Sequence, residues 1–456
     1  MAMPAPSAVL PFEPDAAMLQ QLVADALAQA RAGGATAAEA AASDDAGLAV
    51  TVRLGEVETL EFQRDRGLGL TVYIGQRRGS ASTADLAPAS IRTTVAAALA
   101  IARHTAEDPA AGLPDAALLA TASPERDLAL DLWHPWALEP DAAVAIATRC
   151  EAAARGHDPR IHNSEGATLD SHAGMRVLGN SLGFMGVQRG TRHGLSCSVL
   201  ARDAAGMQRD YWYDAARAAG DLAQPEAIGI EAARRTVRRL GSRRLATCSA
   251  AVLFAPEAAR SLIGHALGAL RGPAQYRRAS FLLGASGEQV FPGWFELDEQ
   301  PLLPRALGSA AFDAEGVATR DRSLVSGGVI GGYLLDSYSA RKLGLASTGH
   351  AGGAHNPRVR AHGGSPAELL RQMGRGLLVT ELLGQGVNGV TGDYSRGAAG
   401  FWVEDGEPVH AVDEVTIAGN LRDIYRGLVA VGSDEDRRGG LRIGSVLASP
   451  LRIAGE

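Results

Sequence analysis

The sequence predicts an α+β protein: an N-terminal helix-strand-strand-strand-helix domain, then a glycine-rich C-terminal domain with a mixed or antiparallel sheet. Two observations predict this fold class. Amphipathic helix patterns flank alternating strand patterns near the N-terminus, and short strand-like runs separated by glycines dominate after residue 245. Helices and strands do not alternate regularly, as a parallel sheet of βαβ units would require. We expect domains over residues 1–105, 106–244 and 245–456.

The N-terminal domain is predicted from its hydrophobic periodicity. Residues 15–32 repeat apolar side chains at spacings of three and four, which is typical of an amphipathic helix. Alternating apolar residues predict strands over 48–54, 57–62 and 68–74, and the two residues between the first pair indicate a hairpin. A second apolar stripe over 91–102 predicts the closing helix.

The middle domain, residues 106–244, is predicted to begin in a linker and to end in a basic helix. Residues 105–127 are rich in alanine, proline and acidic residues and lack clear periodicity, which is typical of a linker. A helix is expected over 141–155 with Asp141 as its N-cap. Short strands broken by glycine and asparagine are expected over 160–215. The arginines of the helix predicted over 223–240 are best interpreted as a solvated face.

The C-terminal domain is predicted to be mostly strands, with a few helices between them. Its strand-like runs are 249–254, 329–335, 377–382, 400–404 and 443–447. Its helical patterns are 256–270, 365–373 and 420–429.

Composition and charge exclude several classes of protein. The formal net charge of -7, from 44 basic and 51 acidic residues, argues against a nucleic-acid partner. The three cysteines, Cys150, Cys197 and Cys248, are far apart and odd in number, which fits a reducing compartment. No run reaches the ~18 apolar residues of a membrane span, and the first residues lack the pattern of a secretory signal. We therefore expect a soluble cytoplasmic protein with no membrane partner.

Two glycine motifs match the residue spacing of nucleotide-binding and hydrolase motifs, but not the secondary structure that those motifs need. GQGVNG at 384–389 satisfies G-x-G-x-x-G, but the glycine-broken residues after it do not predict the helix that a dinucleotide fold needs. GNSLG at 179–183 satisfies G-x-S-x-G, but again no helix is predicted after Ser181. Both motifs are better interpreted as turns that use the backbone freedom of glycine.

Candidate metal ligands and acid–base pairs are equally unspecific. No HExxH motif occurs, and the closest histidine pair, His350 and His355, lies in a glycine-rich segment. Asp313 and Glu315 could act as an acid and a base. Such a sequence, with Asp313 and Glu315 beside Gly316, more commonly forms a turn.

Long blocks of the C-terminal half resemble the PmbA/TldE branch of the TldD/PmbA family. The blocks are FDAEGVATR at 312–320, LLDSYSARKLGLASTGHAGGAHN at 334–356, LLVTELLGQGVNGVTGDYSRGAAGFWVEDGE at 377–407, VTIAGNLRD at 415–423 and VAVGSD at 429–434. The N-terminal half is similar more loosely, through RGLGLTVYIGQRRGSAST at 66–83. The resemblance extends over about residues 15–456.

The resemblance implies a division of labour between two paralogues. The TldD branch resembles a metallopeptidase in which a His-Glu-x-x-x-His helix and a later cysteine hold zinc, with the glutamate activating water. The PmbA/TldE branch is its partner in a heterodimer that degrades or matures small unfolded peptides.

In this chain the zinc-site positions are degenerate. The helix that matches the zinc helix is 256–270, with Arg260 at the first histidine, Ser261 at the glutamate and His265 at the second histidine. Ile443 matches the later cysteine. A guanidinium repels a cation, and neither serine nor isoleucine replaces the missing groups. One histidine cannot make a site of three protein ligands. We therefore expect no catalytic, cofactor-binding or metal-binding residue in this chain, and zinc in the TldD-type partner.

Two alternatives stay open. The chain could be a self-sufficient hydrolase that uses a site without zinc, built from Asp393, Ser395 or the loop of His350. It could also be a regulatory binding protein of the gyrase-modulator type, although its acidic balance gives no support for direct DNA contact.

Overall fold

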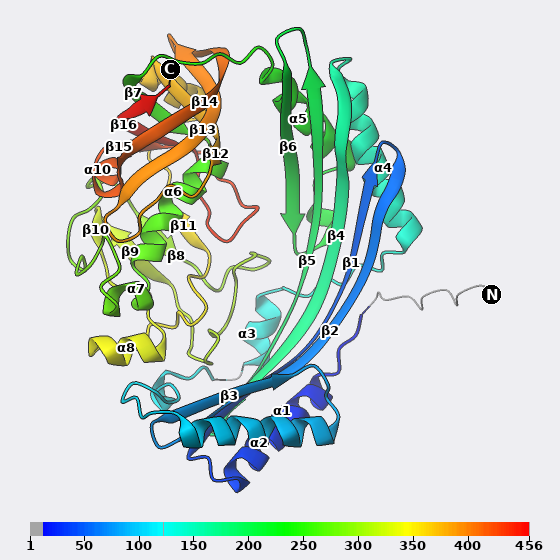
Figure 1. Ribbon diagram of the computed structural model, residues 1–456, viewed down its shortest axis with the longest axis vertical. Coiled ribbons are helices and arrows are strands. Elements are labelled where there is room, and N and C mark those ends of the chain that lie inside the picture. The colour runs from blue at the N-terminus through cyan, green and yellow to red at the C-terminus, as the bar shows by residue number, and fades with distance from the viewer. Residues whose placement is uncertain (1–11, 122, 456) are drawn as a thin grey trace.

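The computed structural model describes residues 12–121 and 123–455 and shows a mixed α+β fold. A long curved antiparallel sheet with helices forms the N-terminal part, and a β-barrel lies beside it in the C-terminal part (Figure 1). This confirms the predicted α+β class and the mixed C-terminal sheet; the closure of that sheet into a barrel was not predicted.

Six strands form the N-terminal sheet, in the order β3-β2-β1-β4-β5-β6. They are β1 (Ala37–Arg53), β2 (Glu56–Ile74), β3 (Arg77–Thr83), β4 (Ile161–Asn180), β5 (Met185–Arg202) and β6 (Met207–Ala216). The sheet continues from β1 directly to β4, so segments far apart in the sequence share one surface.

The predicted strand boundaries need correction. The segments 57–62 and 68–74 are not separate strands but parts of β2, because residues between them stay paired with β1. The third strand is β3, which lies beyond the predicted segments. The short strands expected over 160–215 are three long ones. The hairpin between 48–54 and 57–62 is confirmed, with Leu54 and Gly55 at positive φ in its turn.

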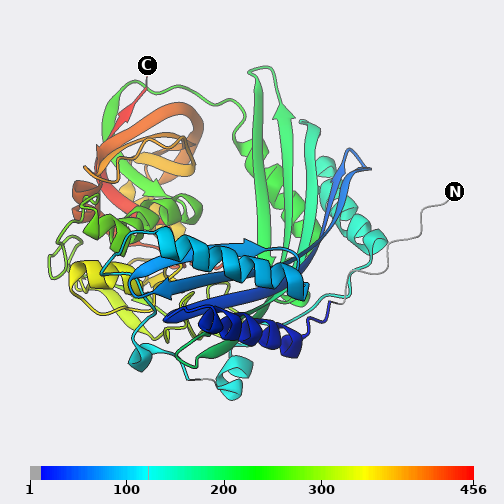
Figure 2. The same cartoon turned by 60° about the horizontal axis from the view of Figure 1, so that its bottom comes forward.

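Four helices cover one face of the sheet and leave the other face toward the C-terminal part. They are α1 (Ala16–Ala32), α2 (Pro88–His104), α4 (Pro140–His157) and α5 (Pro225–Arg238). The first two pack on one half of the sheet (Figure 2), and α4 and α5 pack on the other half. The alternation of each strand decides which side chains are buried: Leu48 and Leu169 face the helices, whereas Asp45 and His172 face the other way.

The predicted helices of this part are confirmed, but one cap is wrong. Helix α4 begins at Pro140, its N-cap is Glu139, and no side chain caps it. Asp141 lies in the first turn instead. Proline is well suited to the first helical position, since the N–H it lacks would have no partner there.

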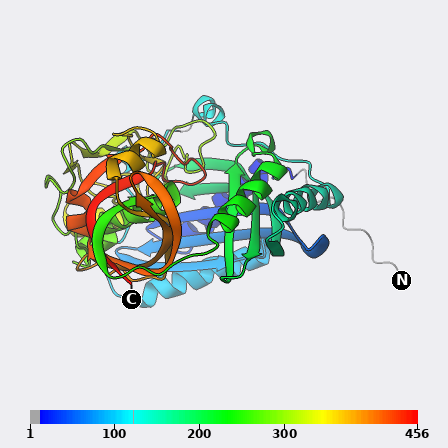
Figure 3. The ribbon, with the colours of Figure 1, turned by 90° about the horizontal axis from the view of Figure 1, so that it is seen from above.

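Five strands close the C-terminal barrel (Figure 3). They follow the order β14 (Glu407–Asn420), β13 (Asp393–Glu404), β12 (Gly376–Leu383), β7 (Cys248–Phe254) and β16 (Val446–Ala454), and β14 also pairs with β16. Strand β15 (Leu428–Val431) extends β16. The pair β7–β12 is parallel and the others are antiparallel, so the sheet is mixed.

Smaller elements complete the C-terminal part. A four-stranded sheet contains β8 (Leu297–Glu299), β9 (Arg322–Ser326), β10 (Val329–Ile330) and β11 (Pro357–Val359). The helices are α6 (Pro256–Ala269), α7 (Gly272–Tyr276), α8 (Ser337–Leu343), α9 (Pro366–Met373) and α10 (Leu421–Arg426). The segment that precedes β4 contains α3 (Pro124–Ala129) and the 3-10 turn Ala116–Leu118, and a second 3-10 turn spans Ala219–Asp221.

The C-terminal predictions are right for the elements of strong periodicity and wrong at several boundaries. Strands over 249–254 and 377–382 and the helix over 365–373 are confirmed. The strand predicted over 329–335 ends at Ile330, and the one over 443–447 begins only at Val446. Within the described residues, no helix is long and apolar enough to cross a membrane.

Candidate functional site

Helix α6 carries three of the four degenerate zinc-site positions, and the prediction of a helix over 256–270 is confirmed. Pro256 occupies the first turn, where its missing N–H costs nothing. The face that packs into the C-terminal core consists of small and aliphatic side chains: Ala258, Ala259, Leu262, Ile263, Ala266 and Ala269. The packing fixes the opposite side of α6 toward strand β6 and the loop that follows β15.

Arg260 is held in an ion pair rather than left free. Its Nη2 donates to Oδ2 of Asp436, and its Nη1 donates to the hydroxyl of Tyr213 at 3.2 Å. The Asp436 side chain is only 3% exposed. Arg260 therefore bridges the C-terminal loop and strand β6 of the N-terminal sheet.

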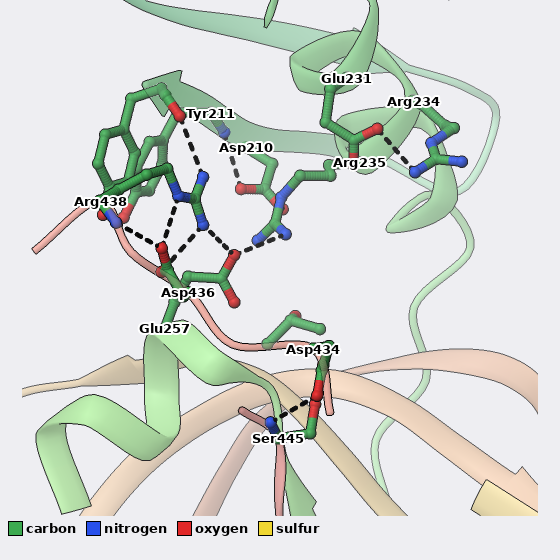
Figure 4. A network of polar contacts seen from close by, with 12 residues as sticks. Asp210, Tyr211, Glu231, Arg234, Arg235, Glu257, Asp434, Asp436, Arg438 and Ser445 are labelled. Atoms are coloured by element: carbon green, nitrogen blue, oxygen red, sulfur yellow. Dashed lines mark hydrogen bonds and ion pairs between the residues drawn. The ribbon is translucent and has the colours of Figure 1, made fainter. Parts of the chain in front are cut away.

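Arg438 strengthens this connection from the same loop (Figure 4). Its Nε lies 2.9 Å from Oδ1 of Asp436, and its Nη2 lies 3.2 Å from Glu257 at the start of α6. The guanidinium carbon of Arg438 lies 3.9 Å from the ring centroid of Trp212, and its Nη1 donates a hydrogen bond to the carbonyl of Tyr213. Two arginines and two carboxylates thus join α6, the loop and β6 in one network.

The network sets the protonation state of its central carboxylate. Burial alone would raise the pKa of Asp436, but hydrogen bonds from Arg438 and the charges of Arg260 and Arg438 outweigh it and lower that pKa. Asp436 is therefore ionised at neutral pH and fully engaged with two cations. Its carboxylate is therefore not free to act as a metal ligand.

Ion pairs extend the network along helix α5. Arg235 lies 3.6 Å from Glu257 and 3.5 Å from Asp210. Arg239 lies 2.5 Å from Glu381 on β12 and 3.8 Å from Asp210. The arginines of this helix were expected to be solvated; for Arg235 and Arg239 that is wrong, because both are largely buried between the two parts of the fold.

Ser261 and His265 lie beside a different arginine. Arg396 of β13 donates to Oγ of Ser261 at 3.4 Å and to the carbonyl of Leu383 at 3.0 Å. The ring of His265 packs edge-on against Tyr394, with centroids 6.2 Å apart. Burial, and then the charge of Arg396, lowers the pKa of His265, so its ring is neutral at pH 7.

Ile443 belongs to the hydrophobic core and is fully buried. Its carbonyl accepts a hydrogen bond of 2.9 Å from the backbone N–H of Asp436. Ile443, which the sequence predicts to be the fourth degenerate position, is therefore adjacent to the carboxylate that holds Arg260.

A cavity of about 190 Å³ lies beside α6, between the N-terminal sheet and the barrel. Its lining residues are Asp210, Tyr211, Trp212, Tyr213, Arg235, Glu257, Ala258, Ser261, Thr380, Glu381, Leu382 and Arg396. Among the described residues, no group of three or more histidine, cysteine, aspartate or glutamate side chains is placed to hold a metal. The residues at this position do not fit a zinc ion, because Arg235, Arg260 and Arg396 are permanent cations that cannot bind a metal.

The two glycine motifs are turns, as interpreted from the sequence. Residues 384–389 lie between β12 and β13, so a strand follows them rather than a helix, and Gly384 has a positive φ of 72°. Ser181 lies in the β4–β5 hairpin, where its Oγ accepts a hydrogen bond of 3.0 Å from the N–H of Ala38.

Two of the remaining candidate residues, His350 and Asp313, are engaged in internal contacts. Nε2 of His350 lies 2.7 Å from Glu299, and its Nδ1 lies 2.8 Å from Oγ1 of Thr348, with both side chains of the ion pair at most 2% exposed. Asp313 accepts hydrogen bonds from three backbone N–H groups, those of Glu315, Val317 and Ala351. It therefore stabilises a turn, as the commoner interpretation of that string predicts.

The alternative hydrolase residues are not arranged as a catalytic pair. Asp393 accepts a hydrogen bond of 2.6 Å from its neighbour Thr391. In the part of the chain that the structure describes, no histidine is hydrogen-bonded to the side chain of Ser395.

Sequence reasoning missed Asp436, Arg438 and Tyr213. The run SDEDRRGG at 433–440 carries a usable signal, since three acids followed directly by two arginines in a short loop often pair with one another. Their partners on α6 and β6 lie far away in the sequence, so only the fold reveals the network.

Comparison with known families gives one consistent result. The chain matches the PmbA/TldA metallopeptidase domain 1 over residues 38–102, the central domain over 133–240 and the C-terminal domain over 247–455.

Individual relatives cover nearly the whole chain. It is 49% identical to the Escherichia coli O157:H7 protein named metalloprotease PmbA, over 96% of each chain, and 45% identical to the Haemophilus influenzae homologue, again over 96% of each. A Bacteroides thetaiotaomicron structure, solved as a candidate modulator of DNA gyrase, superposes with a TM-score of 0.90 at 28% identity, covering 96% of this chain and 99% of the other. TldE from Thermococcus kodakarensis shares the fold, with a TM-score of 0.83 at 20% identity, over 95% and 100% of the two chains.

Proposed function

The chain belongs to the PmbA/TldD metallopeptidase family, and we propose that it is the non-catalytic subunit of a TldD/TldE-type complex that degrades or matures small unfolded peptides. The observation that carries this proposal is the ion pair between Arg260 and Asp436. It occupies the part of α6 where a catalytic paralogue would hold its metal.

The chemistry of that ion pair argues against a metal-dependent reaction in this chain. A zinc ion bound to Asp436 would have to separate this carboxylate from two guanidinium groups, leaving Arg260 without an acid and Arg438 with Glu257 alone. Removing one partner of a buried ion pair costs about 3–5 kcal/mol. His265 then remains as a single neutral ligand, whereas zinc sites use at least three protein ligands.

The preserved architecture supports a role as a partner subunit. Helix α6 is fully packed, and its polar side is tied to the N-terminal sheet by Arg260, Arg438 and Glu257. This network holds the two parts of the fold in a fixed relation, which a subunit that forms one wall of a shared peptide chamber requires. We propose that the TldD-type paralogue supplies the zinc and the glutamate that activates water.

The two alternatives have weaker support. A self-sufficient hydrolase would need an accessible nucleophile and base, but the most triad-like group, Thr348–His350–Glu299, is buried. A regulatory protein that contacts DNA directly would be expected to carry a basic surface, and the net charge is -7.

The decisive experiment assays this chain, its TldD-type paralogue and their mixture on an unfolded peptide in the presence of zinc. We expect cleavage by the mixture, none by this chain alone, and loss of activity on chelation. A mixture prepared with a paralogue whose zinc-helix glutamate is changed to glutamine is the matched control and should be inactive. Cleavage by this chain alone that survives chelation would replace the proposal with the hydrolase alternative; full activity of the paralogue alone would reduce this chain to a regulator.

A further inference from the structure

A second and larger cavity, of about 750 Å³, lies on the polar face of the N-terminal sheet. Strands β1, β2, β4 and β5 form its floor, and it shares no lining residue with the cavity beside α6. Leu128, Leu130 and Leu132, which lie on or just after α3, form an apolar wall. The segment 309–311 of the C-terminal part contributes a further wall.

One side of this cavity carries arginines that have no acidic partner. The guanidinium of Arg217 donates to the carbonyls of Thr191 at 2.9 Å and Leu307 at 2.7 Å, and its buried Nε has no hydrogen-bond partner. Within the part of the chain that the structure describes, no carboxylate forms an ion pair with Arg217 or with the nearby Arg192. Two neighbouring cations without a counter-charge favour an anionic ligand.

The other side of the cavity carries two carboxylates, which lack a basic partner rather than an acidic one. Asp45 and Asp65 lie directly opposite each other in the β1–β2 register, where like charges are destabilising. No basic side chain of the described residues forms an ion pair with either of them. The preceding residue, Asp44, does have basic partners. It lies on the helix-covered face and forms ion pairs with Arg64 and Arg66 at 3.2 and 3.0 Å.

Two glycines on the floor of the cavity make room for the charged side chains of Asp45 and Arg217. Gly174 and Gly190 face each other in the β4–β5 register. A Cβ at Gly174 would lie 1.9 Å from Oδ1 of Asp45, and one at Gly190 would lie 2.9 Å from Nη1 of Arg217. The side chains of Asp45 and Arg217 therefore reach over the glycines from opposite sides of the cavity.

We propose that this cavity binds a short peptide with both ends free, with its ammonium group at Asp45 and Asp65 and its carboxylate at Arg192 and Arg217. The apolar wall of Leu128, Leu130 and Leu132 receives its side chains.

The positions of these groups limit the ligand to a short peptide. Strands β1 and β5 are two interstrand spacings apart, roughly 10 Å, and the side chains of Asp45 and Arg217 reach inward from opposite sides, so their charges lie closer together than this. An extended peptide spans about 3.3–3.6 Å per residue, so no more than two or three residues fit between them. Each charged end of the peptide meets groups that, among the described residues, form no ion pair in the absence of the ligand.

This site goes beyond the proposed function, because it requires neither zinc nor a partner subunit; it shares with that proposal only the class of ligand. Binding to the isolated chain therefore tests it separately. If the complex cleaves peptides but the isolated chain binds no tripeptide, the proposed binding site is wrong and the proposed function still holds.

The experiment titrates the isolated full-length chain with trileucine by calorimetry, and repeats the titration with N-acetyl-trileucine and trileucine amide. We expect saturable binding of the free tripeptide and at least tenfold weaker binding when either end is blocked. Arg192→Gln should weaken binding of free trileucine to the level of the amide, yet leave the affinity for the amide unchanged. Asp65→Asn should behave in the same way toward the acetylated peptide.

Arg320→Gln is the matched control, since Arg320 is exposed and lies outside the cavity. It should leave all three affinities unchanged. Absence of saturable binding, or equal affinities for the free and blocked peptides, would overturn the proposal. So would a loss of affinity in Arg320→Gln as large as that in Arg192→Gln.

Discussion

The guanidinium of Arg260 on helix α6 is hydrogen-bonded to the carboxylate of Asp436, 176 residues later in the chain. Through this contact Arg260, whose charge would repel a metal ion, connects the helix with the loop and, through Tyr213, with strand β6. Because Asp436 also binds Arg438, one carboxylate balances two cations. The two partners of the ion pair should therefore respond differently to substitution.

The first prediction concerns this asymmetry. Asp436→Ala leaves the partly buried Arg260 without an acidic partner and Arg438 with Glu257 alone, and it should lower the free energy of unfolding by about 3–5 kcal/mol. Arg260→Met should cost much less, because Arg438 continues to neutralise Asp436. Denaturant unfolding of both variants measures the difference.

An exposed ion pair provides the control for that experiment. Glu58 and Arg53 lie 3.2 Å apart, and both side chains are more than 40% exposed. Glu58→Gln should change the free energy of unfolding by less than about 1 kcal/mol. Equal losses in Asp436→Ala and Arg260→Met would contradict the view that one carboxylate serves two arginines.

The second prediction concerns the glycines of the 384–389 motif. A Cβ at Gly386 would lie 1.8 Å from the carbonyl oxygen of Ser395, whereas one at Gly389 would meet nothing within 4 Å. Gly386→Ala should therefore destabilise the fold by about 1–3 kcal/mol. Gly389→Ala should be close to neutral.

Thermal unfolding of the two alanine variants separates a structural turn from a ligand-binding loop. A phosphate-binding role would make both glycines matter for nucleotide affinity. We expect no saturable NAD or ATP binding by calorimetry in the wild-type chain. Clear binding of either nucleotide would refute the interpretation of this loop as a turn.

The N-terminal sheet shows which parts of a fold periodicity can predict. The second half of β1 alternates Leu48, Val50 and Val52 and was predicted, whereas its first half, with Ala38, Ala40 and Ala42, was not. Alanine is a poor strand former, and this half is a strand because it pairs with β2 and β4 and packs on helix α1. Barrel closure through β14 and β16 depends on pairing between segments some 35 residues apart, which no local pattern encodes.

The candidate site likewise has one part that the sequence predicts and one part that it does not. The helix that carries Arg260, Ser261 and His265 was predicted because its caps and apolar face are local signals. The contacts of Arg260 with Tyr213 and Asp436 could not be predicted, because they join segments that are distant in the sequence. The charged groups of the large cavity were missed for a related reason: Asp45 lies on β1 and Arg217 just after β6, and only the register of the strands brings them over Gly174 and Gly190.

The third prediction concerns pH. Burial raises the pKa of Glu315 from 4.5 to about 7. Because the folded-state pKa is raised, the favourable contribution is complete below pH 4.5 and is lost as the pH rises through about 7. Relative to Glu315→Gln, the wild-type chain should lose about 3 kcal/mol of stability over this window.

Glutamine is a suitable replacement because its carbonyl oxygen can still accept the hydrogen bond from the N–H of Ser337, 2.9 Å from Glu315 in the wild type. Glu368→Gln is the control of opposite sign, since hydrogen bonds from Ser365 lower the pKa of Glu368. Its effect on stability should stay constant above pH 4.5. Parallel stability curves for the wild type and Glu315→Gln would show that the raised pKa does not exist.

The last prediction concerns zinc itself. The isolated chain should contain no stoichiometric zinc by elemental analysis, whereas its TldD-type paralogue, purified in the same way, should contain about one per chain. The reason lies in three positions: Arg260 is a cation in an ion pair, Ser261 is hydrogen-bonded to Arg396, and Ile443 lies in the core. The double variant Arg260→His, Ser261→Glu restores the helix motif but provides only two histidine ligands, and Asp436 stays bound to Arg438 at 2.9 Å. We expect it to remain zinc-poor as well. If the double variant takes up one zinc, positions 260 and 261 alone exclude the metal and Ile443 plays no part; if the wild-type chain holds one zinc through mild chelation, the chain has a metal site and is not the non-catalytic partner.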